Sequence, residues 1–184
     1  ASLQAISGQK VGKLEIKDEA SARAIEQTLK NARVSVDSIE SKPAKRHPYA
    51  PFRTSTLQQE AARKLGFSAS HTMRVAQTLY EAGAITYMRT DGVQMDPSAI
   101  AAARVAISNR YNGHYLPEKP RHYETKAKNA QEAHEAIRPT DFSKDRAGSG
   151  DHARLYDLIF KRALASQMAT AQLERTVVEL VDGT

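Results

Sequence analysis

Residues 85–92, Ile-Thr-Tyr-Met-Arg-Thr-Asp-Gly, begin like a short strand and end in a polar cluster and a glycine. In an extended segment alternate side chains share a face, so Tyr87, Arg89 and Asp91 are predicted to lie on one side. A guanidinium there can grip a phosphate bidentately and lower the cost of a phenolate. Asp91 can orient Arg89 or hold a proton, and Gly92 permits a sharp turn. The stretch predicts phosphate chemistry, or, more simply, a strand end whose polar residues face water.

A second polar cluster lies at residues 131–140, Gln-Glu-Ala-His-Glu-Ala-Ile-Arg-Pro-Thr. Its first part is typical of a short helix, which would place His134 and Arg138 on one face. Together they would form a compact pair for a phosphate, and His134 can also move a proton. The metalloprotease pattern H-E-x-x-H is excluded because Arg138 stands where a second histidine is needed. For a lone histidine, a surface position near a helix end is the commoner role.

Residues 51–66 place a Thr/Ser run at a helix start. Ser55 and Thr56 are predicted to cap a helix over 57–65 that ends at Gly66. The hydroxyls and N–H groups of that terminus can also bind a phosphate, although capping alone explains them. A second helix is expected from Ser68 or Ser70 to Gly83. The pair, followed by a strand, resembles a helix-turn-helix with a wing, and any αα-hairpin gives the same spacing.

Outside these three segments, the spacing of apolar residues predicts both strands and helices. They are strands at 13–16, 33–37 and 173–181, and helices from Asp18, from Asp96-Pro97 and over 152–168. Residues 41–51 hold three prolines and four basic side chains, which predicts an extended connector and a domain boundary. The fold class is therefore α+β, mainly α, with strand-rich ends around a helical middle. If the two ends pair, the helical part is an insertion within a β-containing domain.

Composition narrows the class of protein only modestly. The 184 residues carry a net charge of +6 and no cysteine, which excludes disulfides and Cys-ligated zinc within this chain and fits a reducing compartment. No apolar run reaches membrane-spanning length. The start at Ala1 and the strand-like end lead us to expect an excised piece of a longer protein. A non-catalytic winged-helix DNA-binding module or a purely structural domain would leave the two polar clusters unexplained.

Three segments closely resemble motifs of the bacterial type IA DNA topoisomerases, in family order. They are residues 51–61 (PFRTSTLQQEA), 80–91 (YEAGAITYMRTD) and 132–141 (EAHEAIRPTD). Met88 and Glu135 resemble the topoisomerase I branch rather than topoisomerase III, while reverse gyrase stays open. Gly92 departs from the family, which usually has Ser there, so a hydroxyl contact at that position is in doubt.

The resemblance implies that Tyr87 attacks a single-stranded DNA phosphodiester, giving a 5′-phosphotyrosine and a free 3′-hydroxyl. Arg89 would position the scissile phosphate, His134 would contact backbone phosphate, and Asp91 and Arg138 would belong to the same shell. It further implies a helical catalytic-tyrosine domain at 47–169, with a helix-turn-helix or winged-helix-like element. This domain would be inserted in part of a β-rich arch domain at 1–46 and 170–184.

The family binds Mg²⁺ in a Toprim domain that this chain lacks, so the resemblance implies no metal site and no independent activity in the fragment. The expected activity of the parent is ATP-independent relaxation of negatively supercoiled DNA. The expected partners are single-stranded and negatively supercoiled DNA and the Toprim and remaining domains of the parent, with no membrane. We expect a monomer in the bacterial cytoplasm, associated with the nucleoid.

Overall fold

The computed structural model describes residues 2–124 and 135–182 and mixes helices with strands, as predicted. In chain order its elements are β1 (Ala5–Ile6), β2 (Gln9–Lys10), α1 (Glu19–Asn31), β3 (Val34–Arg46), α2 (Thr54–Leu65), α3 (Ala69–Glu81), α4 (Pro97–Arg110), the 3₁₀ helix η1 (Gly113–Tyr115), α5 (Gly150–Ser166) and β4 (Ala171–Asp182). The chain divides into two compact units. Unit 1 comprises 1–44 and 174–184, and unit 2 comprises 45–173.

Unit 1 opens with the β1–β2 hairpin, whose turn residues Ser7 and Gly8 both have positive φ (49° and 76°). This backbone matches the twist of a two-residue hairpin. Asp18 caps α1 as predicted, accepting a 2.7 Å hydrogen bond from the Ser21 N–H. The strand predicted at 13–16 is wrong, because these residues form a turn that leaves Leu14 85% exposed.

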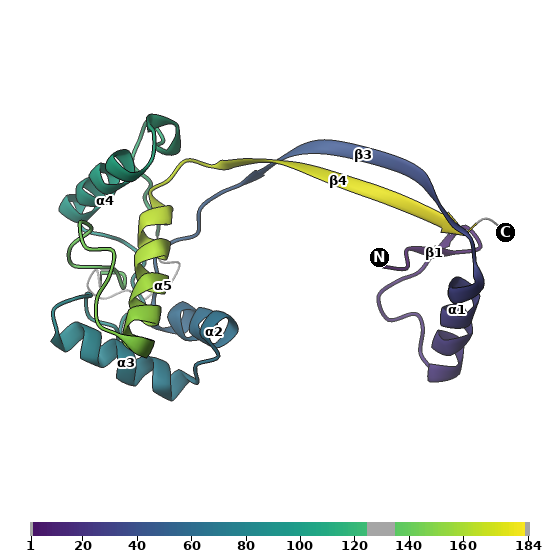
Figure 1. Ribbon diagram of the computed structural model, residues 1–184, viewed down its shortest axis with the longest axis horizontal. Coiled ribbons are helices and arrows are strands. Elements are labelled where there is room, and N and C mark those ends of the chain that lie inside the picture. Colours follow the sequence, from purple (N-terminus) through teal and green to yellow (C-terminus); the bar gives the residue numbers. More distant parts are fainter. Residues whose placement is uncertain (1, 125–134, 183–184) are drawn as a thin grey trace. The chain divides into compact units, whose positions relative to one another are not determined.

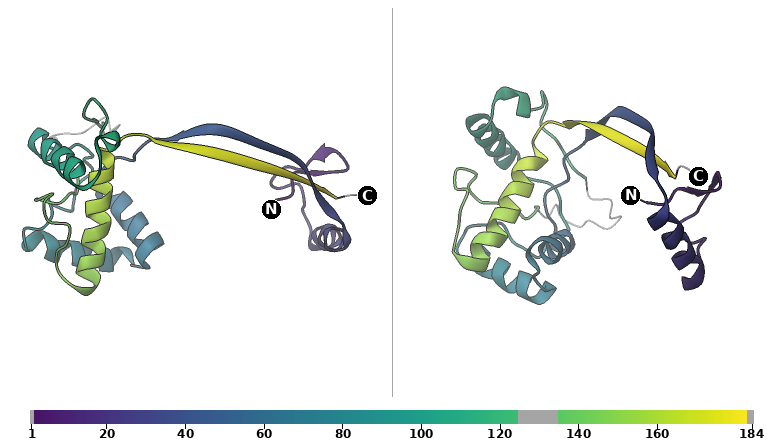
Figure 2. Two further views of the ribbon diagram at one scale, coloured as in Figure 1. Left: turned by 45° about the horizontal axis from the view of Figure 1, so that its top comes forward. Right: turned by 45° about the vertical axis from the view of Figure 1, so that its right-hand side comes forward.

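Strands β3 and β4 form a two-stranded sheet and run side by side in Figures 1 and 2. Ser38 bonds Glu179 and Ser41 bonds Thr176, so positions advance along one strand as they recede along the other, and the pair is antiparallel. The strand predicted at 33–37 is confirmed but is longer than expected. It takes in Pro43 of the predicted connector, which is tolerated because both strands of a two-stranded sheet are edge strands.

Unit 2 is organised around α5, which contacts α2, α3 and α4; Figure 1 shows it between α4 and the α2–α3 pair. Its inward face is apolar at the predicted positions Leu155, Leu158 and Ile159, all of which are buried. The largest fully buried side chains of the core include Tyr156, Phe52, Leu57, Ile85, Met88, Ile107 and Ile137. Several of these come from the three segments singled out in the sequence, so the core lies directly beneath them.

The helix boundaries of unit 2 follow the predicted signals except at α2 and at α5, which runs over Gly150–Ser166 rather than 152–168. Ser68 caps α3 and Asp96 caps α4, and Gly66 ends α2 with a left-handed φ of 73°. Helix α2, however, begins at Thr54 rather than after Ser55 and Thr56. Its cap is Arg53, whose backbone N–H donates to the Thr56 hydroxyl at 3.1 Å. The predicted helix start at residue 57 is therefore three residues too late.

The ion pairs of Glu60 on α2 shift its pKa, and this shift can be tested. Arg63 donates two 3.0 Å hydrogen bonds to its carboxylate, and Lys64 lies 3.0 Å away. These partners, Arg63 first, lower the pKa of Glu60 from 4.5 to about 2. A lowered pKa in the folded state contributes stability above pH 4.5 that is lost as the pH falls through 2.

We therefore expect Glu60→Gln to lower the free energy of unfolding at pH 7 by about 1 kcal/mol, because the two cations are largely exposed. The difference from the wild-type chain should shrink between pH 4.5 and pH 2. Thermal unfolding of both chains at pH 7, 4 and 2 measures this. A difference that is unchanged at pH 2 would contradict the assignment.

Candidate active site

The segment that carries Tyr87 begins where α3 ends. Gly83 has a φ of +69°, a left-handed conformation that favours glycine, and it turns the chain away from the helix. Ala84 then donates to the Leu79 carbonyl at 2.9 Å, and Ile85 forms an antiparallel bridge with Pro139. Beyond that bridge, residues 86–92 form no regular strand. The predicted wing strand is thus reduced to a single bridge.

From Tyr87 to Gly92 exposed and buried residues nevertheless alternate as an extended segment predicts, whereas Ile85 departs from that alternation. Ile85 and Met88 are fully buried and Thr90 is nearly so, whereas Tyr87 is 49% exposed. Arg89 and Asp91 are exposed as well. The Tyr87 ring lies edge-on to Tyr80, with 5.2 Å between ring centroids and an interplanar angle of 63°. Tyr87, the candidate nucleophile, is therefore accessible to solvent, while neighbouring residues of its segment are buried in the core.

Thr54 at the start of α2 forms hydrogen bonds with the backbone of this segment after Tyr87. Its N–H donates to the Thr90 carbonyl at 2.9 Å, and its hydroxyl accepts from the Thr90 N–H at 2.9 Å. The hydroxyl lies 2.7 Å from the Met88 carbonyl and 3.0 Å from that of Thr90. With a single proton it donates best to Met88. Helix α2 is thereby joined to both neighbours of Arg89.

Thr86 fastens the other side of the segment in the same way. Its N–H donates to the Arg138 carbonyl at 2.9 Å, and its hydroxyl accepts from the Arg138 N–H at 3.0 Å and donates to Ala136 at 2.7 Å. Ile137 in turn donates to the Phe52 carbonyl at 2.8 Å. The three segments that are far apart in the sequence thus bond to one another in a closed ring, with Tyr87 on one of them.

The short helix predicted in the first part of residues 131–140 is wrong for residues 135–137. Residues 135–139 are extended and bridge Gln94, Phe52 and Ile85 in turn, because pairing with three segments outweighs the helix propensity of a short Ala/Glu run. Position 138 also precedes a proline, which disfavours helix. His134 lies outside the described residues, so the predicted His134–Arg138 pair is not described.

Arg138 is held close to the backbone by its neighbours. Its Nε donates to Glu135 at 2.5 Å and its Nη1 donates to the Pro139 carbonyl at 2.8 Å, and the side chain is only 13% exposed. Glu135 also accepts from the Asp96 N–H at the start of α4. Arg89, in contrast, has no hydrogen-bond or ion-pair partner among residues 2–124 and 135–182. Of the two guanidinium groups, that of Arg89 is therefore the more accessible.

Two other tyrosines of the chain, Tyr123 and Tyr156, are less suited to act as a nucleophile. The Tyr123 hydroxyl donates to Ser166 at 2.9 Å and the Tyr156 hydroxyl donates to Lys144 at 2.6 Å. Burial raises the pKa of both phenols above the ordinary value, so their phenolates are disfavoured. Tyr87 combines exposure with an exposed arginine two residues along the chain and a hydrogen-bonded backbone on either side.

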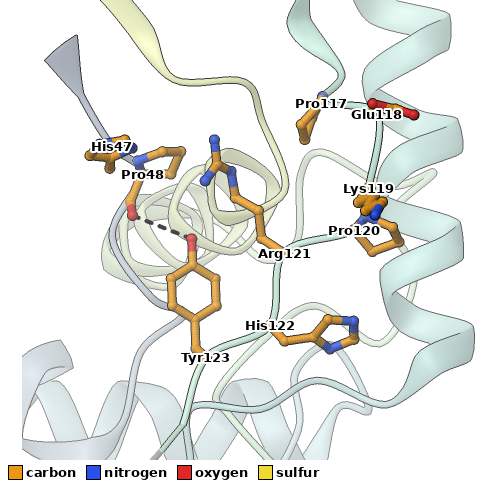
Figure 3. A pocket seen from close by; sticks show the side chains of 9 residues that line it. All are labelled: His47, Pro48, Pro117, Glu118, Lys119, Pro120, Arg121, His122 and Tyr123. Carbon is orange, nitrogen blue, oxygen red and sulfur yellow. Dashed lines mark hydrogen bonds between the residues drawn. The ribbon is translucent and has the colours of Figure 1, made fainter.

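A separate open hollow of about 540 Å³ lies beside the ends of β3 and β4 in unit 2, and Figure 3 shows its lining. It is formed by His47, Pro48 and residues 117–123. Within it, Arg121 donates from Nε to the Met168 carbonyl at 2.7 Å and from Nη2 to Thr170 at 2.8 Å. No sequence motif predicted this arrangement, because its bonds join residues that are more than 40 positions apart. The polar groups of Arg121 and Tyr123 bond mainly to residues 166–170 and thereby brace the end of α5.

Tyr123 offers a test of that brace. Its hydroxyl binds the last carbonyl of α5, at Ser166, which has no helical partner of its own. Tyr123→Phe should lower the free energy of unfolding by about 1–2 kcal/mol. Tyr115→Phe, which removes an exposed hydroxyl, should change it by less than about 0.5 kcal/mol. Chemical denaturation measures both, and equal effects would show that the Tyr123 hydrogen bond is unimportant.

Neither a metal centre nor a membrane span is found in the part of the chain that the structure describes. Among these residues no group of three or more His, Cys, Asp or Glu side chains could hold a metal ion. The Glu135 carboxylate already accepts hydrogen bonds from Arg138 and from the Asp96 N–H. No described helix is long and apolar enough to cross a bilayer.

Known proteins of one family match almost the whole length of this chain. The family model described as DNA topoisomerase matches residues 2–184. The DNA topoisomerase 1 of Zymomonas mobilis is 68% identical over 177 residues, covering 96% of this chain and 15% of that protein. That of Streptomyces coelicolor is 53% identical over 167 residues, covering 89% and 18%.

Among solved structures, full-length topoisomerase I from Thermotoga maritima matches with a TM-score of 0.67 and 34% sequence identity. The match covers 97% of this chain and 29% of that one. The chain therefore spans less than a third of the length of each of these relatives.

Proposed function

The chain belongs to the type IA DNA topoisomerase family, and from that premise we propose that it is the part of a longer topoisomerase that bears the nucleophilic tyrosine. The observation that carries the proposal is the position of Tyr87. It is half-exposed beside Arg89, on a segment that Thr54 and Thr86 bond to the other two segments. This arrangement holds a nucleophile firmly and leaves its ring accessible to a large substrate.

The proposed reaction is a transesterification on single-stranded DNA. The Tyr87 phenol oxygen attacks phosphorus, the new O–P bond forms, and the bond from phosphorus to the 3′ oxygen breaks. The phenolic proton is removed and the departing 3′ oxygen takes up a proton, leaving a 5′-phosphotyrosine and a 3′-hydroxyl. The reverse reaction reseals the strand after another strand has passed. Because one ester replaces another, relaxation of negatively supercoiled DNA needs no ATP.

The side chains around Tyr87 have different roles in this proposal. Arg89 neutralises the charge that grows on the scissile phosphate, a contribution that preorganised cations make strongly in a partly dry site. Asp91 would orient Arg89 once DNA is bound or would hold a proton, and His134 would bind the neighbouring phosphate. Arg138 belongs to the same shell, and its bond to Glu135 suggests that it holds residues 135–139 in place for His134.

We propose that residues 47–169 form the helical catalytic domain and that 1–46 with 170–184 belong to an arch domain, which the division into two units supports. The α2–α3 pair would be its helix-turn-helix element. A Toprim domain elsewhere in the parent would supply the Mg²⁺ site, as the resemblance to the family implies. The whole protein would then act as a monomer on DNA in the bacterial cytoplasm, and this chain alone would be inactive.

Plasmid relaxation tests the proposal. The full-length protein should relax negatively supercoiled plasmid with Mg²⁺ and without ATP, whereas residues 1–184 alone should not. A product that is positively supercoiled only when ATP is present would indicate a reverse gyrase instead. Salt-sensitive binding with no change in linking number would favour the non-catalytic winged-helix module.

A further inference from the structure

We propose that the hydroxyl of Thr54 is a positioning residue for the tyrosine segment, with Thr86 as its counterpart on the other side. The inference rests on the proposed function and adds to it the group that fixes where Arg89 stands relative to Tyr87. Thr54 does not touch DNA in this account. It acts by holding the backbone of Met88 and Thr90, the residues on either side of Arg89.

A hydroxyl is needed at position 54 because of where the residue lies. Thr54 is the first residue of α2, so its carbonyl is directed along the helix and serves the next turn. Its N–H can pair with Thr90 as in a strand ladder, but its carbonyl cannot return the bond. The hydroxyl takes over this missing role by accepting from the Thr90 N–H, and it also donates to the Met88 carbonyl.

The same device recurs at Thr86. Its hydroxyl accepts from the Arg138 N–H and donates to the Ala136 carbonyl, two residues apart, as the Thr54 hydroxyl does with Thr90 and Met88. One hydroxyl thus fixes the backbone just before Tyr87 and the other fixes it just after. A helix N-terminal threonine whose hydroxyl bonds a distant segment is more than a cap. The local capping here belongs to Thr56.

The consequence for the reaction follows from geometry. Tyr87 and Arg89 share the exposed side, and the buried Met88 between them sets their separation. If the Met88 carbonyl and Thr90 N–H lose their partner, the backbone that carries Arg89 is free to shift. Misplacement by about 1 Å can cost on the order of 10²-fold in rate while substrate binding remains. Loss of the hydroxyl should therefore slow cleavage more than it weakens binding.

The test uses the full-length protein and four variants. Thr54→Val keeps the shape and removes the hydroxyl, Thr54→Ser keeps the hydroxyl, and Thr86→Val removes the counterpart. Thr56→Val is the matched control, because its hydroxyl lies one half-turn away and bonds only to Arg53. The single-turnover rate constant for covalent attachment is measured with a 3′-labelled single-stranded oligonucleotide and Mg²⁺. Fluorescence anisotropy gives the Kd for the same oligonucleotide.

Thr54→Val and Thr86→Val should each lower the rate constant by about 10- to 100-fold, with Kd changed by less than about threefold. Thr54→Ser and Thr56→Val should stay within about threefold of wild type. A Thr54→Val protein that reacts at the wild-type rate constant, or loses only amplitude because fewer molecules are folded, would overturn the positioning role. If Thr54→Val does not fold, Thr86→Val decides by the same criteria. If wild-type protein forms no adduct, the proposed function itself fails, which separates the two cases.

Discussion

Replacement of Tyr87 by Phe should abolish covalent attachment to DNA and plasmid relaxation in the full-length protein, by at least about 10⁴-fold. The variant loses only the phenol oxygen, which in our account is the atom that bonds to phosphorus, and no other group can replace it. Folding should be unaffected, because the ring stays edge-on to Tyr80 and the hydroxyl is on the exposed side. Gel-based relaxation and thermal unfolding measure the two properties.

Tyr115→Phe is the matched control for that experiment. Tyr115 is as exposed as Tyr87, at 49%, and packs against another tyrosine ring, but it lies outside the ring of three segments. Its variant should relax plasmid at the wild-type rate. If Tyr115→Phe were inactive and Tyr87→Phe active, the site would be assigned to the wrong tyrosine.

Replacement of Arg89 by Gln should slow covalent attachment by about 10²- to 10³-fold, the second largest effect that we expect. The side chain is exposed and has no described partner, so its charge is available to the scissile phosphate as negative charge grows there. Arg89→Lys should recover only part of the rate, because an ammonium lacks the bidentate fork of a guanidinium. Single-turnover cleavage of a labelled oligonucleotide gives these rate constants.

Arg146 provides the comparison for the Arg89 variants, since it is an exposed cation in the loop before α5. Arg146→Gln removes the same charge and should leave the cleavage rate within about threefold of wild type. If it slowed cleavage as much as Arg89→Gln, the effect would come from net charge and long-range attraction of DNA. The result would then depend strongly on salt, which a direct contact in the transition state would not require.

Local chemistry explains which parts of the fold the sequence could predict. Asp18, Ser68 and Asp96 each cap the helix that they were expected to start, because a short side-chain oxygen at these positions satisfies a free N–H. Gly66 ends α2 for an equally local reason. Strand 13–16 failed because alternation alone does not make a strand when no partner strand lies beside it.

The candidate site could be predicted in part. The exposed alternation of Tyr87, Arg89 and Asp91 follows from local period, and the structure shows it. The role of Thr54 did not follow, because a threonine at a helix start is explained equally well as a cap. The extended form of residues 135–139 depends on bridges to Gln94, Phe52 and Ile85, which are distant in the sequence. Long-range pairing of this kind overrides helix propensity.

The most direct test of the central claim is to find where DNA becomes attached to the full-length protein. Single-stranded oligonucleotides labelled at the 3′ or the 5′ end are mixed with protein and Mg²⁺ and stopped with detergent, and the labelled protein is digested and sequenced by mass spectrometry. Our account predicts that only the 3′ label is captured, on the peptide that contains Tyr87. Capture of the 5′ label, or attachment to a different tyrosine, would contradict it.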